Sequence, residues 1–484
     1  MHRAVQAMGE KHAPLNQVTA LPERLELGPL AIDVLKRHAG RGPRYTSYPP
    51  VTAWSDAVGP DEYHAALQHA RDFAPTRPQS VYVHLPFCPS HCWFCACNVL
   101  ITDRTDLADT YLDNVERELE LLRPSLSHAP VVQLHWGGGS PSYLTPAQME
   151  RLHAMLTRTF LLAPDAEQSI EVDPRITSDD HLTTLRRLGF NRLSMGVQDF
   201  DPMVQLAIHR IQTGTLTANF VKKCRQFGFE SLSMDLIYGL PRQNRESFAQ
   251  TLALVCDMAP DRVAVYGYAH VPWLKPLQKS FENHALPGPD LRFELFREAL
   301  SLFLDEGYAY VGMDHFAKPN DELAIAAQSG TLHRNFMGYT TRAGTDLVSL
   351  GMTAISFVDG LYAQNQHKLN PYYRDVTARR LPVTRGWRLT RDDEIRAAVI
   401  QDLMCRSRVQ KRAVELQFGV QFDSYFADAL QALVPLVADG LCVVTADAIE
   451  ATFLGRVLIR TLAMAFDAHL PQAMDGRARF SATV

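Results

Sequence analysis

The sequence has 484 residues, and at about 150 residues per domain this length suggests two or three domains. Its 48 lysines and arginines against 53 aspartates and glutamates give a formal net charge of −5, so no overall positive field exists to attract a nucleic acid. Although 46% of the residues are hydrophobic, no apolar run is long enough for a membrane span, and the first residues lack the apolar core of a signal peptide. We therefore expect a cytoplasmic protein with no nucleic-acid partner and no membrane span.

A repeating pattern of short apolar runs and amphipathic stretches begins near residue 81. Residues 1–38 before it show no clear periodicity and predict a surface extension, and residues 40–50 predict irregular chain. The apolar runs predict strands at Val81–Leu85, Val131–His135, Ser169–Val172, Arg192–Met195, Leu232–Ile237 and Arg262–Tyr266. The stretches between them predict helices at Asp109–Leu122, Met149–Phe160, 178–188, 214–227 and 245–257. Such a repeat favours a parallel sheet with helices outside, open or curled into a partial barrel, and its chemistry at the carboxyl ends of the strands.

The repeat ends near Leu286-Pro287-Gly288-Pro289. Residues 289–384 predict one helix, 292–305, and loops rich in aromatic residues and histidine, and mostly helical sequence follows Gly386. Two strand-like runs, Leu441–Thr445 and Ile449–Phe453, add a small ribbon and suggest a winged-helix-like module. We therefore predict an extension (1–40), a catalytic domain (41–285), a substrate-side region with loops (286–385) and a C-terminal helical cap (386–484).

Four of the eight cysteines are crowded into one short segment, Cys88-Pro-Ser-His-Cys92-Trp-Phe-Cys95-Ala-Cys97. Three thiolates with spacings of three and then two residues can wrap a loop around one [4Fe–4S] cubane and leave one iron open to a substrate. A structural zinc usually takes two Cys/His pairs separated by a longer stretch, so a zinc site is a weaker explanation of this spacing. Clustering of the four cysteines by chance is a weaker explanation too. The other four cysteines are expected to be small buried hydrophobes.

Further chemistry-bearing residues lie at the ends of the predicted strands. Gly137, Gly138 and Gly139 close the second strand. Glycine lets the backbone approach a ligand closely because it has no Cβ, although three glycines can also simply form an ordinary turn. Polar residues lie on or just after successive strands: Glu171, Gln198, Arg210 and Asp235. Neither a Walker A loop nor a complete dinucleotide fingerprint is present, so phosphate or dinucleotide binding is not favoured.

The three-cysteine loop after the first strand resembles the radical S-adenosylmethionine superfamily. Further motifs narrow the resemblance to the oxygen-independent coproporphyrinogen III oxidase family, over roughly residues 41–470. These motifs are the pair Cys97-Asn98, the entry segment Arg44-Tyr-Thr-Ser-Tyr-Pro49, His135-Trp-Gly-Gly-Gly-Ser-Pro141, Asp235-Leu-Ile-Tyr-Gly-Leu-Pro241, Gly312-Met-Asp-His-Phe316 and His333-Arg-Asn-Phe336.

This resemblance implies an α/β fold: a partial (β/α)6 radical-SAM barrel with an N-terminal extension and a winged-helix-like C-terminal domain. It implies one [4Fe–4S] cluster held by Cys88, Cys92 and Cys95, with Cys97 as a fourth cysteine that is not a ligand, and two S-adenosylmethionine molecules. Contacts to the molecule on the cluster are implied for Tyr82, Gly138, Glu171 and Ile355, of which we assign Tyr82 and Glu171 to catalysis. Contacts to the second are implied for Phe94, Cys95, Ala96, Gly139, Ser140, Gln198, Arg210, Asp235 and Ala269.

The implied reaction is an oxidative decarboxylation without oxygen. A 5′-deoxyadenosyl radical removes a hydrogen from a propionate of coproporphyrinogen III, carbon dioxide and one electron leave, and a vinyl group remains. A second propionate reacts likewise to give protoporphyrinogen IX. The family implies an electron donor such as a flavodoxin or ferredoxin and a monomeric enzyme. Because the substrate carries four carboxylates, we also expect Arg44, Lys318 and Arg334 to lie near its cavity.

Departures from the family's common pattern leave alternatives open. Ala96 stands where glycine is frequent, and Ser140 and Ser142 stand where threonine is frequent. The segment Cys405-Arg-Ser-Arg-Val409 lacks the usual asparagine and aromatic residue, which puts the choice of substrate in doubt. The alternatives are a related enzyme that acts on another tetrapyrrole, a haem chaperone, a haem-degrading radical enzyme, and an iron–sulfur or zinc module without activity.

Overall fold

In the computed structural model, which describes residues 29–38, 40–283 and 286–470, the six predicted strands lie side by side in parallel. They are β1 (Gln79–Leu85), β4 (Val131–Gly138), β5 (Leu162–Val172), β6 (Arg192–Gln198), β7 (Ser231–Tyr238) and β8 (Arg262–Gly267). Six of the seven residues of β1 are buried, so the strand lacks the alternation of buried and exposed positions that marks a half-exposed strand. β5 begins well before the predicted Ser169. Its first four residues, Leu162–Asp165, are partly or fully exposed, so no buried apolar run marks this part of the strand in the sequence.

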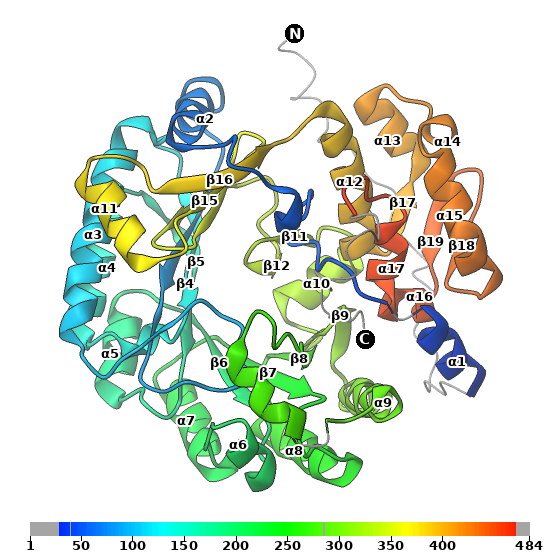
Figure 1. Ribbon diagram of the computed structural model, residues 1–484, viewed down its shortest axis with the longest axis horizontal. Helices are drawn as coiled ribbons and strands as arrows, with labels where there is room; N and C mark the ends of the chain where they lie inside the picture. Colours follow the sequence, from blue (N-terminus) through cyan, green and yellow to red (C-terminus); the bar gives the residue numbers. More distant parts are fainter. Residues whose placement is uncertain (1–28, 39, 284–285, 471–484) are drawn as a thin grey trace.

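Helices cover the outer side of this sheet (Figure 1). They are α2 (Pro60–Phe73), α3 (Asp106–Leu122), α4 (Pro146–Thr157), α5 (Asp179–Arg187), α6 (Pro202–Ala207), α7 (Gly214–Gln226), α8 (Arg245–Met258) and α9 (Pro289–Asp305), with short 3-10 turns at 51–53, 123–125, 141–143 and 276–283. Thr145 accepts a hydrogen bond from Gln148 N and so caps α4, as the Thr145-Pro146 pair indicates. The predicted (β/α)6 architecture is confirmed.

The region after residue 285 differs from the expected helix and loops, because most of it extends the sheet at both edges. The sheet has twelve strands in the order β16-β15-β14-β13-β1-β4-β5-β6-β7-β8-β10-β9. Its added strands are β9 (Ala309–Gly312), β10 (His315–Ala317), β13 (Asp346–Leu350), β14 (Ile355–Val358), β15 (Leu361–Asn365) and β16 (Val383–Arg388). Four smaller elements complete the region: α10 (Glu322–Ser329), β11 (His333–Asn335), β12 (Gly338–Thr340) and α11 (Leu369–Thr377). Short strands of three to six residues between glycines leave too little periodicity to be recognised.

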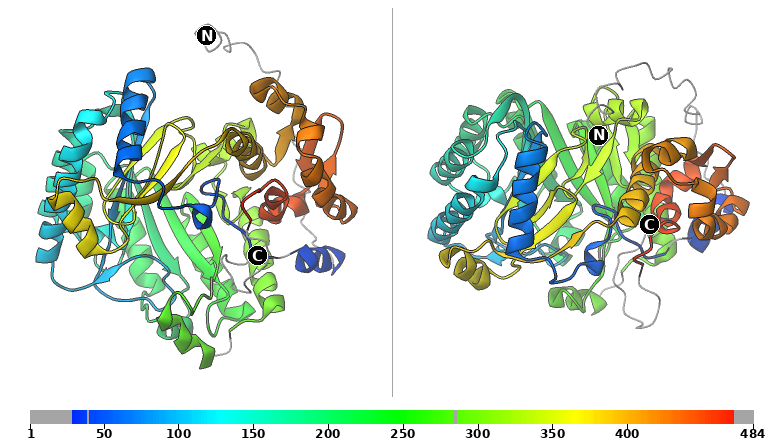
Figure 2. Two further views of the ribbon diagram at one scale, coloured as in Figure 1. Left: turned by 45° about the horizontal axis from the view of Figure 1, so that its top comes forward. Right: turned by 90° about the horizontal axis from the view of Figure 1, so that it is seen from above.

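The C-terminal region packs as a separate group of helices at one end of the sheet (Figure 2). It contains α12 (Arg391–Arg406), β17 (Arg408–Gln410), α13 (Lys411–Phe418), α14 (Phe422–Tyr425), α15 (Ala427–Ala438), β18 (Cys442–Val444), β19 (Ala448–Ala451), α16 (Phe453–Val457) and α17 (Ile459–Met464). The two predicted ribbon strands are β18 and β19, and β17 joins them as a third strand that the sequence analysis missed. The last two strands, β2 (Phe87–Cys88) and β3 (Leu100–Ile101), form a small pair of their own.

A helix occupies part of the predicted N-terminal extension. α1 (Pro29–His38) lies beside the C-terminal helices, where both Arg37 and His38 contact the carboxylate of Asp439. The expectation of an aperiodic extension is therefore wrong for these residues, and residues 1–28 lie outside the described part of the chain. No helix of the described residues combines the length and the apolar character that a membrane crossing requires.

One buried carboxylate joins α3 to the added strands. Glu118 accepts hydrogen bonds from Gly351 N (2.8 Å), from Asn365 Nδ2 on β15 (2.6 Å) and from the Tyr372 hydroxyl on α11 (2.7 Å). Burial raises the pKa of Glu118 to about 7, although all three donors lower it. The contacts fix the β13–β15 edge against the helix that follows β1.

Replacing Glu118 by alanine should therefore destabilise the fold. We expect Glu118→Ala to lower the free energy of unfolding by about 3 kcal/mol, because each buried donor left without an acceptor costs at least about 1 kcal/mol. Glu120→Ala, on the exposed face of the same helix, should change it by less than about 0.5 kcal/mol. Urea unfolding followed by circular dichroism measures both, and equal midpoints would contradict the structural role of Glu118.

Candidate active site

The cysteine loop begins at the carboxyl end of β1 and is held by backbone hydrogen bonds at both ends. Leu100 N donates to Pro86 O (2.7 Å), and Thr102 N donates to Cys88 O (3.0 Å). Within the loop, Trp93 N donates to Ile208 O (3.0 Å), and Gln278 Nε2 donates to Phe94 O (3.0 Å). These bonds tie the loop to β3, to the end of α6 and to the 3-10 turn at 276–283.

Polar neighbours surround the thiols. Cys88 Sγ lies 3.6 Å from Ser140 Oγ, and Arg210 Nη1 lies 3.6 Å from Cys92 Sγ. Cys97 lies against Cys95 and donates its N–H to Cys95 Sγ (3.4 Å). A hydrogen bond from the Cys97 side chain lowers the pKa of Cys95 to about 6, whereas burial raises the pKa of Cys88 to about 11. In the described part of the chain, no three or more His, Cys, Asp or Glu side chains are grouped as they would be around a metal ion.

Glu171 is the centre of a second group of side chains, at the ends of β1, β4 and β5. It accepts a hydrogen bond from Gly138 N (3.0 Å) and lies 3.5 Å from His135 Nε2. Burial alone would raise the pKa of Glu171, but His135 and the Gly138 N–H outweigh it and hold this pKa below its usual value. The ring of His135 stacks on Tyr82, with centroids 5.8 Å apart. Glu171 is therefore ionised and fixed.

Two histidines that the sequence analysis did not single out complete this group. The Tyr82 hydroxyl lies 3.1 Å from His84 Nδ1, and the other ring nitrogen of His84 lies 3.2 Å from Asn98 O in the cysteine loop. His135 Nδ1 lies 2.7 Å from Ser169 Oγ. The spacing of two between Tyr82 and His84 places both on one face of β1, which is the signal that could have found His84.

A third group lies at the ends of β6 and β7. Arg210 Nη2 donates to Gly196 O (2.8 Å) and Gln212 Oε1 (2.9 Å), which aims the guanidinium at the sheet end. Gln198 has a φ of 69°, a left-handed conformation that costs energy for a residue with a side chain. Burial and the charge of Glu171 raise the pKa of Asp235 to about 7. Among the described residues, Gln198 Oε1 and Arg210 Nε are buried without a hydrogen-bond partner.

The remaining predicted contacts lie around these groups. Gly139 N and Ser140 N donate to Leu85 O and Phe87 O, each at 2.8 Å, next to the cysteine loop that carries Phe94 and Ala96. A Cβ on Gly139 would lie 2.7 Å from Phe87 O, so this position requires glycine. Ile355 begins β14, and its carbonyl accepts from Ser349 Oγ, whose residue pairs with Tyr82. Ala269 lies just beyond the carboxyl end of β8.

Of the three expected substrate cations, the structure brings two together. Arg334 Nε donates to Arg44 O (3.2 Å). Lys318 lies elsewhere, because its Nζ donates to Ala259 O (2.8 Å) before the amino end of β8, away from the cysteine loop. The expectation for Lys318 is wrong, since the antiparallel β10 carries the chain back to that end. Arg460, on α17 and near Arg44, is a cation that no sequence motif indicated.

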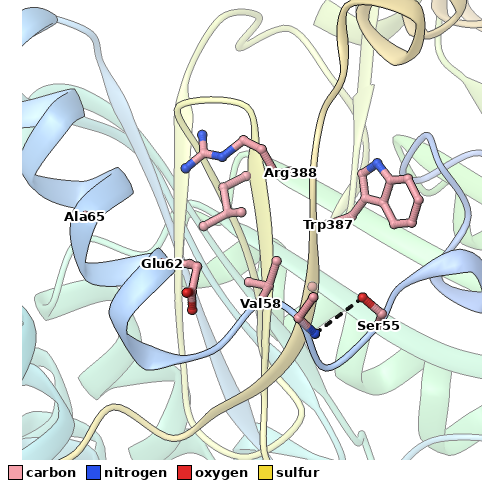
Figure 3. A pocket seen from close by; sticks show the side chains of 9 residues that line it. Ser55, Val58, Glu62, Ala65, Trp387 and Arg388 are labelled. Atoms are coloured by element: carbon pink, nitrogen blue, oxygen red, sulfur yellow. Dashed lines mark hydrogen bonds between the residues drawn. The ribbon is translucent and has the colours of Figure 1, made fainter.

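A hollow of about 440 Å³ between α2 and the β15–β16 edge contains none of the predicted site residues (Figure 3). Its wall includes Val58, Glu62 and Trp387 and is closed by backbone hydrogen bonds between Ser55 and Gly386. It is separate from the candidate active site.

Comparisons with known proteins agree with this arrangement. Residues 82–255 match the Radical SAM superfamily, and residues 389–458 match the HemN C-terminal domain. The chain is 44% identical over 439 residues to the oxygen-independent coproporphyrinogen III oxidase of Escherichia coli, and the alignment covers 91% of this chain and 95% of that protein. It is 38% identical to the Helicobacter pylori enzyme of the same name, over 92% of this chain and 97% of that one.

The chain belongs to the oxygen-independent coproporphyrinogen III oxidase family. A solved structure of the Escherichia coli enzyme, described as a radical SAM enzyme, superimposes with a TM-score of 0.85 at 45% identity and covers 88% of this chain and 98% of that one. The family's cofactors are a [4Fe–4S] cluster and S-adenosylmethionine. The residues present fit both, because three thiols on a fixed loop suit the cluster, and the buried, unpartnered Gln198 Oε1 and Arg210 Nε suit a polar ligand.

The close approach at Gly139 yields a prediction about cofactor retention. In Gly139→Ala the added methyl would meet the backbone that leads into Cys88, at 2.7 Å from Phe87 O and 2.8 Å from the Pro86 carbonyl carbon. We expect less iron per chain after anaerobic reconstitution and a loss of about 2 kcal/mol in stability. Gly214→Ala, whose methyl would meet Leu254 at an ordinary 3.5 Å, is the control. Equal iron contents in the two variants would contradict this reading.

Proposed function

We infer that the chain carries out the oxygen-independent oxidative decarboxylation of coproporphyrinogen III to protoporphyrinogen IX. The observation that carries this inference is that the cysteine loop, with Arg210 beside Cys92, and the fixed carboxylate of Glu171 lie at the same end of a parallel sheet, in a member of this family. When bound, the cluster and S-adenosylmethionine supply the one-electron chemistry that removes a hydrogen atom from a propionate side chain.

We propose that Cys88, Cys92 and Cys95 are the cluster ligands and that Cys97 is not. The Lys275 ammonium donates to Cys97 O (2.9 Å), and the Arg210 guanidinium lies beside Cys92. Both positive charges lower the pKa of Cys95 and so favour its thiolate form, which binds iron. Cys97, by contrast, donates its backbone N–H to Cys95 Sγ, and its thiol is hydrogen-bonded to the same sulfur, so we assign to Cys97 the positioning of that sulfur.

For S-adenosylmethionine, the proposed contacts divide between two molecules. Tyr82, Gly138, Glu171 and Ile355 would hold the one on the cluster, and the ionised Glu171 suits its ammonium group. The second molecule would lie against Gln198, Arg210 and Asp235, where the guanidinium suits a carboxylate and the two side-chain oxygens suit an amine or hydroxyls. In the catalytic role proposed for them, Glu171 fixes the positive charge of the cofactor, and the Tyr82 ring with the two histidines excludes water from one side of it.

The proposal extends to the conditions of the reaction. The substrate is coproporphyrinogen III, and a flavodoxin or ferredoxin supplies electrons. We propose that the enzyme acts as a monomer in the cytoplasm, where a reducing environment keeps thiols free, and all eight cysteines of the structure are free.

Arg406 lies in the segment that departs from the family pattern. Its side chain donates to Gly330 O and pairs with Asp402, so it does not reach the site groups.

Removing one proposed ligand tests the function. Protein reconstituted without oxygen, with reductant, S-adenosylmethionine and coproporphyrinogen III, should yield both 5′-deoxyadenosine and protoporphyrinogen IX. Cys92→Ala should lose both products, because a cluster that lacks one of its three thiolate ligands is not retained. Cys256→Ala, a cysteine on α8 far along the chain from the loop, should retain them.

The products separate the alternatives. 5′-Deoxyadenosine without the porphyrin product would point to a radical enzyme with another substrate. Neither product from wild-type protein with an intact, reducible cluster would overturn the inferred function.

Asp235 gives a prediction about pH. Because burial raises its pKa to about 7, this carboxyl carries a proton at pH 6 that must leave before it can pair with the ammonium of S-adenosylmethionine. The affinity should therefore rise about fivefold from pH 6 to pH 7 and about another twofold by pH 8, above which it levels off. Asp235→Asn should abolish this slope, whereas the exposed Asp180→Asn should keep it. Equilibrium dialysis at each pH measures the dissociation constants, and an unchanged slope in Asp235→Asn would exclude this group.

A further inference from the structure

Two arginines lie together beyond the ends of β7 and β8. Neither is among the residues proposed to contact the cofactors. Arg44 lies in the irregular segment between α1 and α2, which runs from the C-terminal helices to the far edge of the sheet (Figure 1). Arg334 lies on β11 and is only 5% exposed. Its Nε donates to Arg44 O (3.2 Å), so residues 290 positions apart in sequence form one group.

Within the described ranges of the chain, these two guanidinium groups have one carboxylate partner between them. Asp314 pairs with Arg44, and the charges of Arg44 and Arg460 hold the pKa of Asp314 below its usual value despite its burial. Arg334 instead lies over the Tyr339 ring, 4.7 Å from its centre, and its Nη1 is buried without a hydrogen-bond partner in the described residues. A buried guanidinium with an unsatisfied N–H is costly unless a ligand completes it.

The surroundings favour an anion at this place. His315 Nδ1 is also buried without a partner among the described residues, and burial lowers the pKa of His315 to about 3, so the ring is neutral and can donate. Arg460, whose Nη1 donates to Gly42 O (3.1 Å), adds a third positive charge nearby, and burial together with Arg44 lowers its pKa to about 10. Cations that destabilise one another in this way are stabilised by a bound carboxylate.

This group adjoins the cofactor end of the sheet. Tyr266, at the end of β8, has Arg44 over its ring at 5.1 Å, and its pKa is raised by burial and by the charge of Asp235. Tyr266 is thus in contact with Arg44 and within electrostatic range of Asp235, a residue proposed to bind S-adenosylmethionine. The Arg44 side chain is 32% exposed, so a ligand can reach the group.

We propose that Arg44, Arg334 and His315 form a subsite for a carboxylate of the substrate, which rests on the proposed function for the substrate's identity. An arginine-paired carboxylate is stabilised as an anion and resists loss as carbon dioxide. The subsite therefore holds a propionate that the product retains, and it orients the macrocycle so that the reacting propionates face the cofactors. Arg44 and Arg334 are positioning residues.

Binding of stable porphyrins tests the subsite without catalysis. Fluorescence titration would compare coproporphyrin III with its tetramethyl ester, and protoporphyrin IX with its dimethyl ester. Wild-type protein should bind both free acids at least about tenfold more tightly than the esters, because an ester cannot pair with a guanidinium. Arg334→Gln should weaken both acids by about tenfold or more and leave the esters within about twofold.

Matched variants keep the test decisive. Lys318→Gln removes a cation away from this group and should change nothing, and Arg334→Lys should recover part of the preference for the acids. Binding of S-adenosylmethionine should be unchanged in Arg334→Gln, which shows that the fold is intact. If Arg334→Gln does not fold, Arg44→Gln takes its place with the same expected loss.

Three results would overturn the subsite. They are equal affinity of wild-type protein for acids and esters, an unchanged preference for the acids in folded arginine variants, and a preference for coproporphyrin III alone. The last would mean that the arginines hold a propionate that reacts. A failure to convert coproporphyrinogen III, with the acid preference present and lost in the variants, would instead overturn the proposed function and leave a carboxylate subsite in place.

Discussion

The close backbone contact between the end of β4 and the chain that leaves β1 is the constraint on which the site depends. Gly139 N and Ser140 N bind the carbonyls of Leu85 and Phe87 at the point where the cysteine loop begins. The contact leaves no room for a Cβ at Gly139. Because it fixes the start of the loop relative to β4, it also fixes the cysteines relative to Gly138, whose N–H binds Glu171. The same backbone contact thus holds the proposed sulfur ligands and the Glu171 carboxylate in a fixed position relative to each other.

The second requirement is that this sheet end be covered. The β13–β16 strands extend one edge, and Ser349 on β13 lies opposite Tyr82 and bonds to Ile355 on β14. At the other edge, β10 carries His315 next to the ring of Tyr266. The entry segment with Arg44 and the C-terminal helix with Arg460 then pack over the remaining side. Residues from nearly the whole chain therefore meet at the carboxyl end of the sheet.

The sequence predicted those parts whose signals are local. The apolar runs of β1, β4, β7 and β8 and the cap at Thr145 depend on neighbouring residues, and so does the cysteine spacing. The same reasoning missed β13, because a five-residue strand gains its stability from pairing with β1, more than 250 residues earlier. Lys318 and Arg334 look alike in sequence, and only the antiparallel course of β10 separates them. Arg460 lies on a helix whose place depends entirely on tertiary packing.

The parallel pairing of β1 with β13 also bears on how the chain reaches its native state. β1 is an interior strand only because Asp346–Leu350 arrives to cover its free side. Until that segment has been synthesised, the N–H and C=O groups along that side of β1 form an open edge, which invites pairing with other chains. Contacts of such long sequence separation form slowly. The strand that carries the cysteine loop therefore has both its neighbours only when residues 346–350 are present.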